Sequence, residues 1–324
     1  MEEPQFHETG PGVLEHFVGQ ARAVEQARTV LEATWTTTRP LPHLLLLGPS
    51  GTGKTELAQI LAKERPTRLH QALGQNLADG RAVAALLLRA EAGDAFLIDE
   101  AHELRPAAQV QLYRAIAEYR VFLSGGPFGR EPAPVQVPPF TLIAATTDEF
   151  ALQKPLRSRF EVALRFTYYS KQELVTILQQ RATRMHWPVD EVVLHEIAQR
   201  AHGVPRLALN LLKACQRTVE SHNEDRITRP RALETFAREG IDPLGLNPDE
   251  RRYLELLAVS RRARLSTLAA RMDLPHTTLA RVLEPPLIRL GLIERQADSQ
   301  RIITAAGLAH LAAEGDSSRP IAVP

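Results

Sequence analysis

Residues 44–55 read Leu-Leu-Leu-Leu-Gly-Pro-Ser-Gly-Thr-Gly-Lys-Thr, an apolar run followed directly by a glycine-rich loop. The apolar run predicts a buried strand, and the spacing of apolar residues over 57–62 predicts a helix after the loop. A loop of pattern G-x-x-x-x-G-K-[ST] wraps its backbone N–H groups around a phosphate at the positive end of the following helix. The order strand, loop, helix therefore predicts an α/β fold that binds a nucleoside triphosphate.

Two side chains of this loop carry the chemistry. Lys54 is placed to reach the β- and γ-phosphates, and the Thr55 hydroxyl is placed to ligate Mg²⁺. The residues of this segment that we expect around the nucleotide are Gly48, Pro49, Ser50, Gly51, Thr52, Gly53, Lys54, Thr55 and Glu56.

Composition bounds the class of protein. A chain of 324 residues predicts two or three domains, and 44% hydrophobic residues can form their cores. The net charge of +1 does not by itself indicate a nucleic-acid-binding protein. One cysteine, Cys215, an acidic N-terminus without an apolar signal segment, and no apolar run near the ~20 residues of a membrane span predict a soluble cytoplasmic protein.

The chain separates into blocks of different pattern. Residues 1–168 alternate short apolar runs with helical patterns, which predicts a parallel sheet covered by helices, with strands at 44–47, 96–98 and 140–145. Residues 169–240 predict a helical bundle, and 241–313 predict short helices followed by paired strands at 292–295 and 301–304. The helices expected in the bundle are 171–185, 190–201, 205–221 and 229–238. Residues 240–248 are turn-rich and predict a linker, and 314–324 predict a disordered tail.

Two acidic residues form a second motif directly after the predicted strand at 96–98. Asp99 is expected in the Mg²⁺ shell, and Glu100 is expected to polarise the attacking water. Two acids at a strand end are common, but their position about 45 residues after Lys54 favours a catalytic pair. Residues 99–102 also spell the DEAH box that is typical of one superfamily of helicases. We interpret that match as incidental, because such helicases need a second sheet domain and nothing after residue 170 predicts one.

Three further polar residues are candidates for the same site. Thr146 ends a predicted buried strand and either holds the water near the γ-phosphate or only satisfies the strand end. Arg159 lies in the segment 155–160; an arginine supplied by a neighbouring subunit accelerates phosphoryl transfer about 10³–10⁵-fold, and the alternative is an exposed salt bridge. Arg206 opens a predicted helix from which it could reach the phosphates.

These five pieces resemble, in order and spacing, Walker A, Walker B, sensor 1, arginine finger and sensor 2 of AAA+ ATPases. The resemblance is closer to the RuvB family of Holliday-junction branch-migration motors and covers roughly 13–312. The stretches that carry it are 17–20, 138–142, 155–160, 240–246 and 283–291. It implies a P-loop ATPase domain, a helical lid, a C-terminal winged-helix domain, ATP as nucleotide and a ring, most simply a hexamer.

The resemblance also implies roles for single residues. Residues 17–20, including Phe17 and Val18, would flank the adenine, and Tyr169 would contact the nucleotide near the domain hinge. Arg159 would be the finger acting in trans, and Arg206 would be sensor 2. The segment 121–137, which includes Phe128, would be a hairpin that docks onto a RuvA-like partner; the alternative is a hairpin packed only on its own domain.

The third block predicts contacts with duplex or branched DNA. Arg281, Arg295 and Arg301 are the candidates, because recognition helices and wings reach DNA phosphates through arginines. Residues 249–313 contain ten arginines and seven acids, a modest excess of +3. RuvB wings carry an Arg-x-Pro-Arg-Gly-Arg type of turn, whereas 295–301 here read Arg-Gln-Ala-Asp-Ser-Gln-Arg, which predicts weaker binding and a shallower salt dependence. Winged helices also bind proteins, so that reading stays open.

Three functions compete on this evidence. The first is a ring motor that translocates DNA and drives branch migration. The second is a clamp-loader-like or transposition-type switch that uses ATP to assemble without processive movement. The third is a DNA-binding adaptor in which nucleotide binding is regulatory. The acidic pair and Arg159 favour the first two, and the RuvB-like third block favours the first.

Overall fold

The computed structural model describes residues 13–37, 40–65, 68–123 and 133–317. Tertiary contacts divide the chain into two compact units, one comprising 1–177 with 203–207 and the other 178–202 with 208–324. No helix in the described part of the chain is long and apolar enough to span a membrane.

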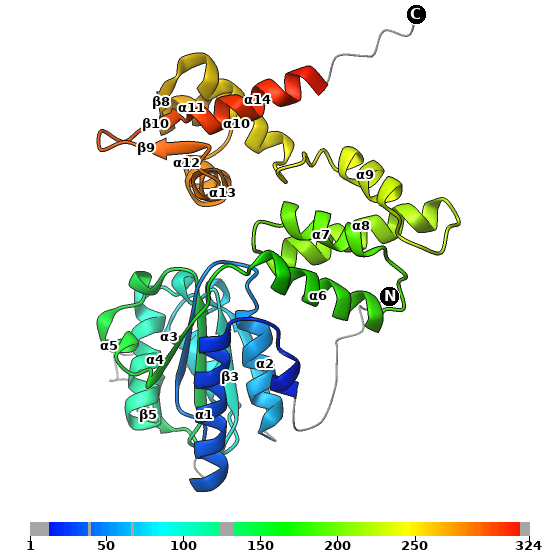
Figure 1. Ribbon diagram of the computed structural model, residues 1–324. Coiled ribbons are helices and arrows are strands. Elements are labelled where there is room, and N and C mark those ends of the chain that lie inside the picture. Colours follow the sequence, from blue (N-terminus) through cyan, green and yellow to red (C-terminus); the bar gives the residue numbers. More distant parts are fainter. Residues whose placement is uncertain (1–12, 38–39, 66–67, 124–132, 318–324) are drawn as a thin grey trace, which may run out of the picture. The chain divides into compact units, whose positions relative to one another are not determined.

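A five-stranded sheet in the order β2-β3-β6-β1-β7 forms the centre of the first unit (Figure 1). Every neighbouring pair is parallel. The three inner strands are buried on both faces, which is why they read as continuous apolar runs. The strands are β1 (Leu44–Leu47), β2 (Leu69–Leu73), β3 (Ala95–Asp99), β6 (Thr141–Thr146) and β7 (Val162–Arg165).

Helices cover both faces of this sheet and form two buried clusters. On one face, Leu44 and Leu46 of β1 pack with α1 and α2, and on the other face their neighbours Leu45 and Leu47 pack with α3 and α4. The longer helices are α1 (Ala21–Thr37), α2 (Lys54–Glu64), α3 (Gly80–Leu87) and α4 (Pro106–Glu118). The short elements are η1 (Val13–His16), η2 (Gly74–Asn76), η3 (Ala101–Glu103), η4 (Glu149–Ala151) and α5 (Lys154–Arg157).

The predicted hairpin before the third inner strand is present. β4 (Arg120–Leu123) pairs antiparallel with β5 (Ala133–Gln136). Val121 belongs to the core of its own unit, whereas Leu123 is exposed. Phe128 lies outside the described residues.

The three strands predicted for the parallel sheet are confirmed, but its other two strands, β2 and β7, were not predicted. These two are the edges of the sheet. Residues of β2 are all half-buried or exposed and include His70 and Gln71. Edge strands need less apolar character, so they lack the continuous run that reveals an inner strand.

The lid helices α6 (Lys171–Arg184), α7 (Glu191–Arg200), α8 (Pro205–Ser221) and α9 (Arg229–Arg238) match the four predicted ranges to within one residue at each end. The segment after α9 is more ordered than a linker. Asp242 is buried, its carboxylate accepts from Leu246 N at 2.9 Å, and it lies 2.8 Å from His310 Nε2. A Cβ on Gly245 would lie 2.3 Å from the Arg200 carbonyl oxygen, so the second unit packs tightly around this segment.

A winged helix ends the chain, with a three-stranded antiparallel sheet in the order β8-β10-β9. Its core includes Tyr253, Leu257, Leu268, Leu287 and Ile293. The elements are α10 (Pro248–Ser260), β8 (Arg262–Arg264), α11 (Leu265–Met272), α12 (His276–Thr278), a π-helical turn η5 (Leu279–Leu283), α13 (Glu284–Arg289), β9 (Ile293–Arg295), β10 (Gln300–Ile303) and α14 (Ala305–Ser317). Helix α14 thus continues four residues into the predicted disordered tail.

Candidate functional site

The candidate nucleotide site lies where three neighbouring strands of the first unit end. Strand β6 lies between β1 and β3, so the phosphate loop after β1, the acids after β3 and Thr146 of β6 meet at one edge. Two hydrogen bonds join the three segments: Gly48 N donates to Thr146 O at 3.3 Å, and Thr55 Oγ1 donates to Asp99 Oδ2 at 2.7 Å. Residues far apart in the sequence are therefore brought together at this edge.

The side chain of Lys54 folds back onto its own phosphate loop. Its Nζ donates to Gly48 O and Pro49 O, both at 2.8 Å, and only 6% of the residue is exposed. Burial lowers the pKa of the Lys54 ammonium. The nearby carboxylates of Glu100 and Asp99 oppose that shift, and the positive charge of Arg206 adds to it. Its two acceptors are neutral carbonyl oxygens, so this ammonium carries a charge that a phosphate could neutralise.

Arg206 reaches the same loop from the start of α8. Its Nη1 donates to Ser50 Oγ at 3.4 Å, and its backbone N donates to Gly51 O at 3.3 Å. Gly51 has φ +73°, and a Cβ there would lie 2.9 Å from both Arg206 Cβ and Val204 Cγ1. Glycine therefore permits both the turn of the loop and the approach of Arg206.

Thr55 and Asp99 form an oxygen pair suited to Mg²⁺. Their contact at 2.7 Å leaves Asp99 Oδ1 to accept from Glu100 N at 2.9 Å, which orients the carboxylate. Magnesium is usually held by one or two protein oxygens together with phosphate and water oxygens. The residues present fit that ion.

Glu100 has a left-handed backbone, with φ 49° and ψ 48°. Such a conformation in a residue other than glycine is sparsely populated and concentrates at functional sites. A Cβ on Gly74 would lie 2.4 Å from Glu100 O, so the close approach of η2 requires glycine at that position. Sequence reasoning did not identify Gly74, because nothing local shows which distant backbone it meets.

His102 is a second residue of this site that the sequence did not identify. Its Nδ1 lies 3.3 Å from both Glu100 Oε2 and Thr146 Oγ1. The signal was present in the sequence as the last letter of the Asp-Glu-Ala-His motif, which we interpreted as incidental. The structure brings that histidine between two predicted catalytic residues.

Two aromatic residues close the other end of the loop. A Cβ on Gly53 would lie 3.1 Å from Phe17 Cζ and 3.5 Å from Tyr169 Oη. Tyr169 Oη donates to Thr52 O at 3.1 Å, and burial raises the pKa of Tyr169 to about 12, so it stays a hydrogen-bond donor at neutral pH. Val18 is half-buried beside Phe17 in sequence, whereas Glu56 is exposed on the first turn of α2.

Arg159 lies on the surface of the first unit. Its guanidinium stacks 5.1 Å from the centroid of the Tyr113 ring, and Nη2 donates to Tyr113 Oη at 3.5 Å. No carboxylate of the described residues pairs with it in the structure. The salt-bridge alternative therefore has no partner within the described part of this chain.

The wing arginines surround a buried carboxylate. Glu284 is fully buried and accepts from Arg301 Nε at 2.8 Å, from Arg295 Nε at 2.9 Å and from Tyr253 Oη at 2.8 Å. Burial alone would raise the pKa of Glu284, but the hydrogen bonds from Arg301, Tyr253 and Arg295 outweigh it and lower the pKa. Arg301 is only 7% exposed. The prediction that Arg301 contacts DNA loses its basis, because the guanidinium is enclosed and neutralised.

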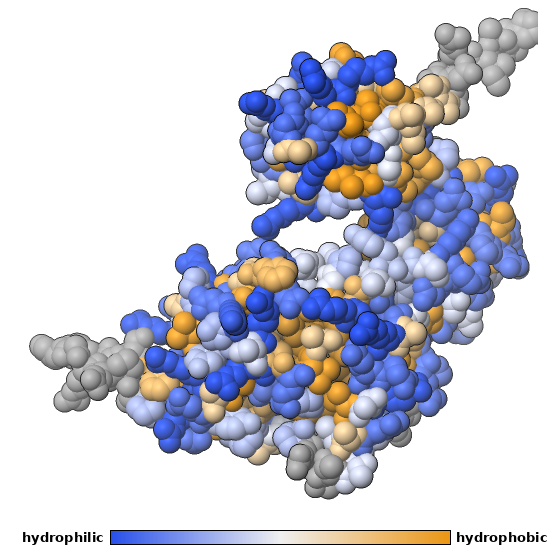
Figure 2. Space-filling view, turned by 60° about the vertical axis from the view of Figure 1, so that its left-hand side comes forward, coloured by the Kyte–Doolittle hydropathy of each residue, from blue (hydrophilic) through white to orange (hydrophobic). Residues whose placement is uncertain are grey.

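The other two predicted DNA residues are accessible. Arg295 keeps 47% of its side chain exposed although it also contacts Glu284. Arg281 is exposed on η5, and the described residues provide no ion-pair partner for it. The visible face of the molecule is mostly hydrophilic, with apolar surface broken into patches (Figure 2).

Comparison with known proteins agrees with this arrangement. Residues 9–166 match the family model of the Holliday junction DNA helicase RuvB P-loop domain, 169–242 that of the RuvB AAA lid domain, and 243–312 that of the RuvB C-terminal winged helix domain. The chain belongs to the RuvB family.

Individual RuvB proteins resemble it over nearly their whole length. The chain is 31% identical over 313 residues to the Holliday junction branch migration complex subunit RuvB of Ehrlichia ruminantium (strain Gardel), covering 96% of this chain and 94% of that protein. The solved structure of the Thermotoga maritima RuvB Holliday junction branch migration motor superposes with a TM-score of 0.82 at 33% identity, covering 93% of this chain and 97% of that one. A mutant of the same Thermotoga RuvB gives a TM-score of 0.83.

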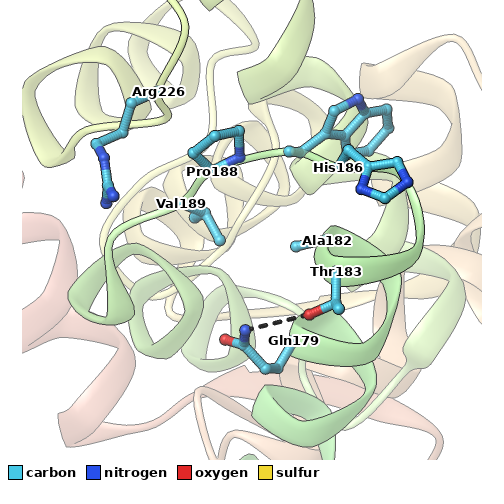
Figure 3. A pocket seen from close by; sticks show the side chains of 8 residues that line it. Gln179, Ala182, Thr183, His186, Pro188, Val189 and Arg226 are labelled. Atoms are coloured by element: carbon cyan, nitrogen blue, oxygen red, sulfur yellow. Dashed lines mark hydrogen bonds between the residues drawn. The ribbon is translucent and has the colours of Figure 1, made fainter.

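A surface hollow of about 410 Å³ in the second unit does not belong to this RuvB-like site. It lies between the end of α6 and the segment after it, with Arg226 on the far side from His186 (Figure 3). Arg226 is paired with Asp190 at 2.9 Å, and Gln179 donates to Thr183 at 3.5 Å. None of the residues predicted to bind nucleotide or DNA lines it.

Proposed function

We propose that this RuvB-family chain is an ATP-driven ring motor, most simply a hexamer, that moves duplex DNA and drives Holliday-junction branch migration in the cytoplasm. One observation carries the ATPase half of the proposal: the phosphate loop, the Thr55–Asp99 pair, Glu100, Thr146 and Arg206 meet at one edge of the parallel sheet. The names of its RuvB relatives, a branch migration complex subunit and a branch migration motor, support the DNA half.

In this proposal ATP is held by the loop N–H groups, Lys54 and Arg206, with the adenine near Phe17, Val18 and Tyr169. Thr55 and Asp99 would hold Mg²⁺, which neutralises charge on the phosphate oxygens when bound. Glu100 orients and polarises a water that attacks the γ-phosphorus, and Thr146 helps to place that water. The bond that breaks joins the γ-phosphorus to the β–γ bridging oxygen, and ADP leaves.

Arg159 acts on the site of a neighbouring subunit. Two features support this role: the side chain is exposed, and it has no carboxylate partner among the described residues. Phosphoryl transfer spreads negative charge over the γ-phosphate oxygens, and an arginine from a neighbour stabilises that charge by about 10³–10⁵ in rate.

A complementation experiment tests the intersubunit site. Glu100→Gln and Arg159→Ala are each expected to lose DNA-stimulated ATP turnover. When the two inactive proteins are mixed and reassembled, some interfaces combine an intact Glu100 with an intact Arg159, and turnover should return. Arg157→Ala, two residues away and stacked on Phe150 at 5.1 Å, is the matched control and should keep most turnover. A mixture that stays inactive while each oligomer forms normally would reject the trans role.

The DNA half is tested on a synthetic four-way junction. Wild-type protein should couple ATP turnover to strand exchange, with Arg281 and Arg295 contributing phosphate contacts. Turnover without strand movement would instead support the switch function, and nucleotide binding without turnover would support the regulatory adaptor. For the partner, we propose docking of a RuvA-like protein through 121–137, where Leu123 is exposed and Phe122 is fixed by Arg114 at 4.9 Å.

A further inference from the structure

His102 connects two catalytic candidates that come from different strands. It lies in η3, directly after Glu100, and its side chain is 15% exposed. Nδ1 is 3.3 Å from Glu100 Oε2 and forms a hydrogen bond of 3.3 Å with Thr146 Oγ1 at the end of β6. The other ring nitrogen, Nε2, lies 3.4 Å from Glu103 Oε1, which belongs to a half-exposed side chain.

The surrounding groups determine which atom donates in the hydrogen bond between His102 Nδ1 and Thr146 Oγ1. A carboxylate only accepts, so a favourable contact with Glu100 needs a hydrogen on Nδ1. The Thr146 hydroxyl donates to Asp148 O and accepts from Asp148 N, both at 3.1 Å, so its remaining lone pair is also an acceptor. One Nδ1–H therefore faces two acceptors, one on the base and one on the residue expected to sense the γ-phosphate.

We propose that His102 is a positioning residue that makes the placement of the Glu100 carboxylate depend on the hydrogen bonding of Thr146. The inference rests on the proposed ATPase function. When the Thr146 hydroxyl stops accepting from Nδ1–H, that hydrogen can bond to Glu100 alone; when it accepts again, the bond to Glu100 weakens. Each change moves the Glu100 carboxylate and so alters how it holds the attacking water. The left-handed backbone of Glu100 fixes the direction in which its side chain leaves the main chain, and the contact with His102 at 3.3 Å then orients the carboxylate.

Three substitutions test the proposal in the full-length protein. His102→Ala should lower kcat at least about tenfold, the size expected for small displacement of a reacting group, with ADP affinity changed less than twofold. His102→Asn keeps an N–H donor at the position of Nδ1 and should recover most of kcat. Glu103→Gln alters only the Nε2 side and should behave like wild type. Equal loss in His102→Ala and His102→Asn with unchanged melting temperature, or no loss in either, would overturn the proposal.

A double-mutant comparison tests the coupling itself. Thr146→Val removes the hydroxyl at nearly constant volume. If His102 acts through Thr146, the double variant with His102→Ala should be about as slow as the slower single variant. If the fold-losses in kcat of His102→Ala and Thr146→Val instead multiply in the double variant, the coupling is rejected.

A spectroscopic readout without nucleotide completes the test. In protein labelled with ¹⁵N-histidine, Thr146→Val should shift the ring nitrogen resonances of His102 and leave those of the surface residue His195 unchanged. Unshifted His102 resonances would reject the contact. If wild-type protein has no ATP turnover, the proposed function fails; if wild type turns over ATP and His102→Ala equals it, only the role of His102 fails.

Discussion

The nucleotide edge and the wing both gather cationic side chains, but they use them differently. Lys54 and Arg206 donate to neutral oxygens of the phosphate loop, whereas Arg301, which is itself buried, donates to the buried carboxylate of Glu284. A cation on neutral acceptors can exchange them for a phosphate at little cost. A cation that neutralises a buried carboxylate cannot bind a phosphate in this way, because its departure would leave the carboxylate buried and uncompensated. The environment of an arginine or lysine, and not its presence, therefore separates a ligand-binding cation from a structural one.

The largest expected effect is at the nucleotide edge. Lys54→Ala removes the cation that we assign to the β- and γ-phosphates and should lower ATP turnover by about 10²–10³-fold or more, by analogy with loss of a single transition-state donor. Steady-state phosphate release measures it. Lys63→Ala, on the exposed face of the same helix, is the control. Turnover within a few-fold of wild type in Lys54→Ala would remove the contrast between the two regions.

The next largest effect should be in the wing. Glu284→Ala leaves Arg301 without its carboxylate in an enclosed position, which should destabilise the winged helix by about 3–5 kcal/mol. Native-state hydrogen exchange of amides in β9 and β10 measures the free energy of opening for this region. Glu294→Ala on the exposed face of β9 should change it little. A loss below about 1 kcal/mol would mean that the buried network is not structural.

A smaller effect concerns Glu250, which is buried at the start of α10. Burial, together with Asp242 and Asp249, raises the pKa of Glu250 to about 7, against the opposing hydrogen bond from Asn247 N. The folded state therefore favours the protonated form of Glu250. This preference stabilises the fold fully below about pH 4.5 and is lost as the pH rises through about 7. The loss in the free energy of unfolding is about 3 kcal/mol.

Unfolding of wild type and Glu250→Gln between pH 5 and 8 checks this sign. Wild type should become less stable across the range, Glu250→Gln should lose most of that slope, and Glu255→Gln on the exposed side of α10 should keep it. A wild-type protein whose stability rises with pH would show that Glu250 is ionised in the fold.

The smallest effect separates two arginines of the winged helix. Arg281→Met should reduce the slope of log K against log salt for duplex DNA by about 0.9, the value for one phosphate contact. Arg301→Met should leave that slope unchanged and lower stability instead, because its guanidinium is internal. Equal reductions in slope for both variants would return Arg301 to the DNA surface.

The parts of the site that the sequence predicted share one property: each is a short motif at the end of a strand or the start of a helix. The phosphate loop, Asp99 with Glu100, and Thr146 could be placed together because carboxyl ends of parallel strands meet at one edge. Gly74 could not be predicted, because its requirement arises from the Glu100 backbone of another segment. The edge strands β2 and β7 were missed because their half-exposed residues lack a continuous apolar pattern.

By itself the sequence determined the order of the elements, the class of ligand and the family, since those depend on local periodicity and on residues at fixed spacing. Only the tertiary structure decided which polar groups are satisfied within the chain. It buried Arg301 against Glu284, left Arg159 and Arg281 without carboxylates from the described residues, and brought His102 between Glu100 and Thr146. The physical reason is that the function of a charge depends on its acceptors and its burial, and both are supplied by residues distant in the sequence.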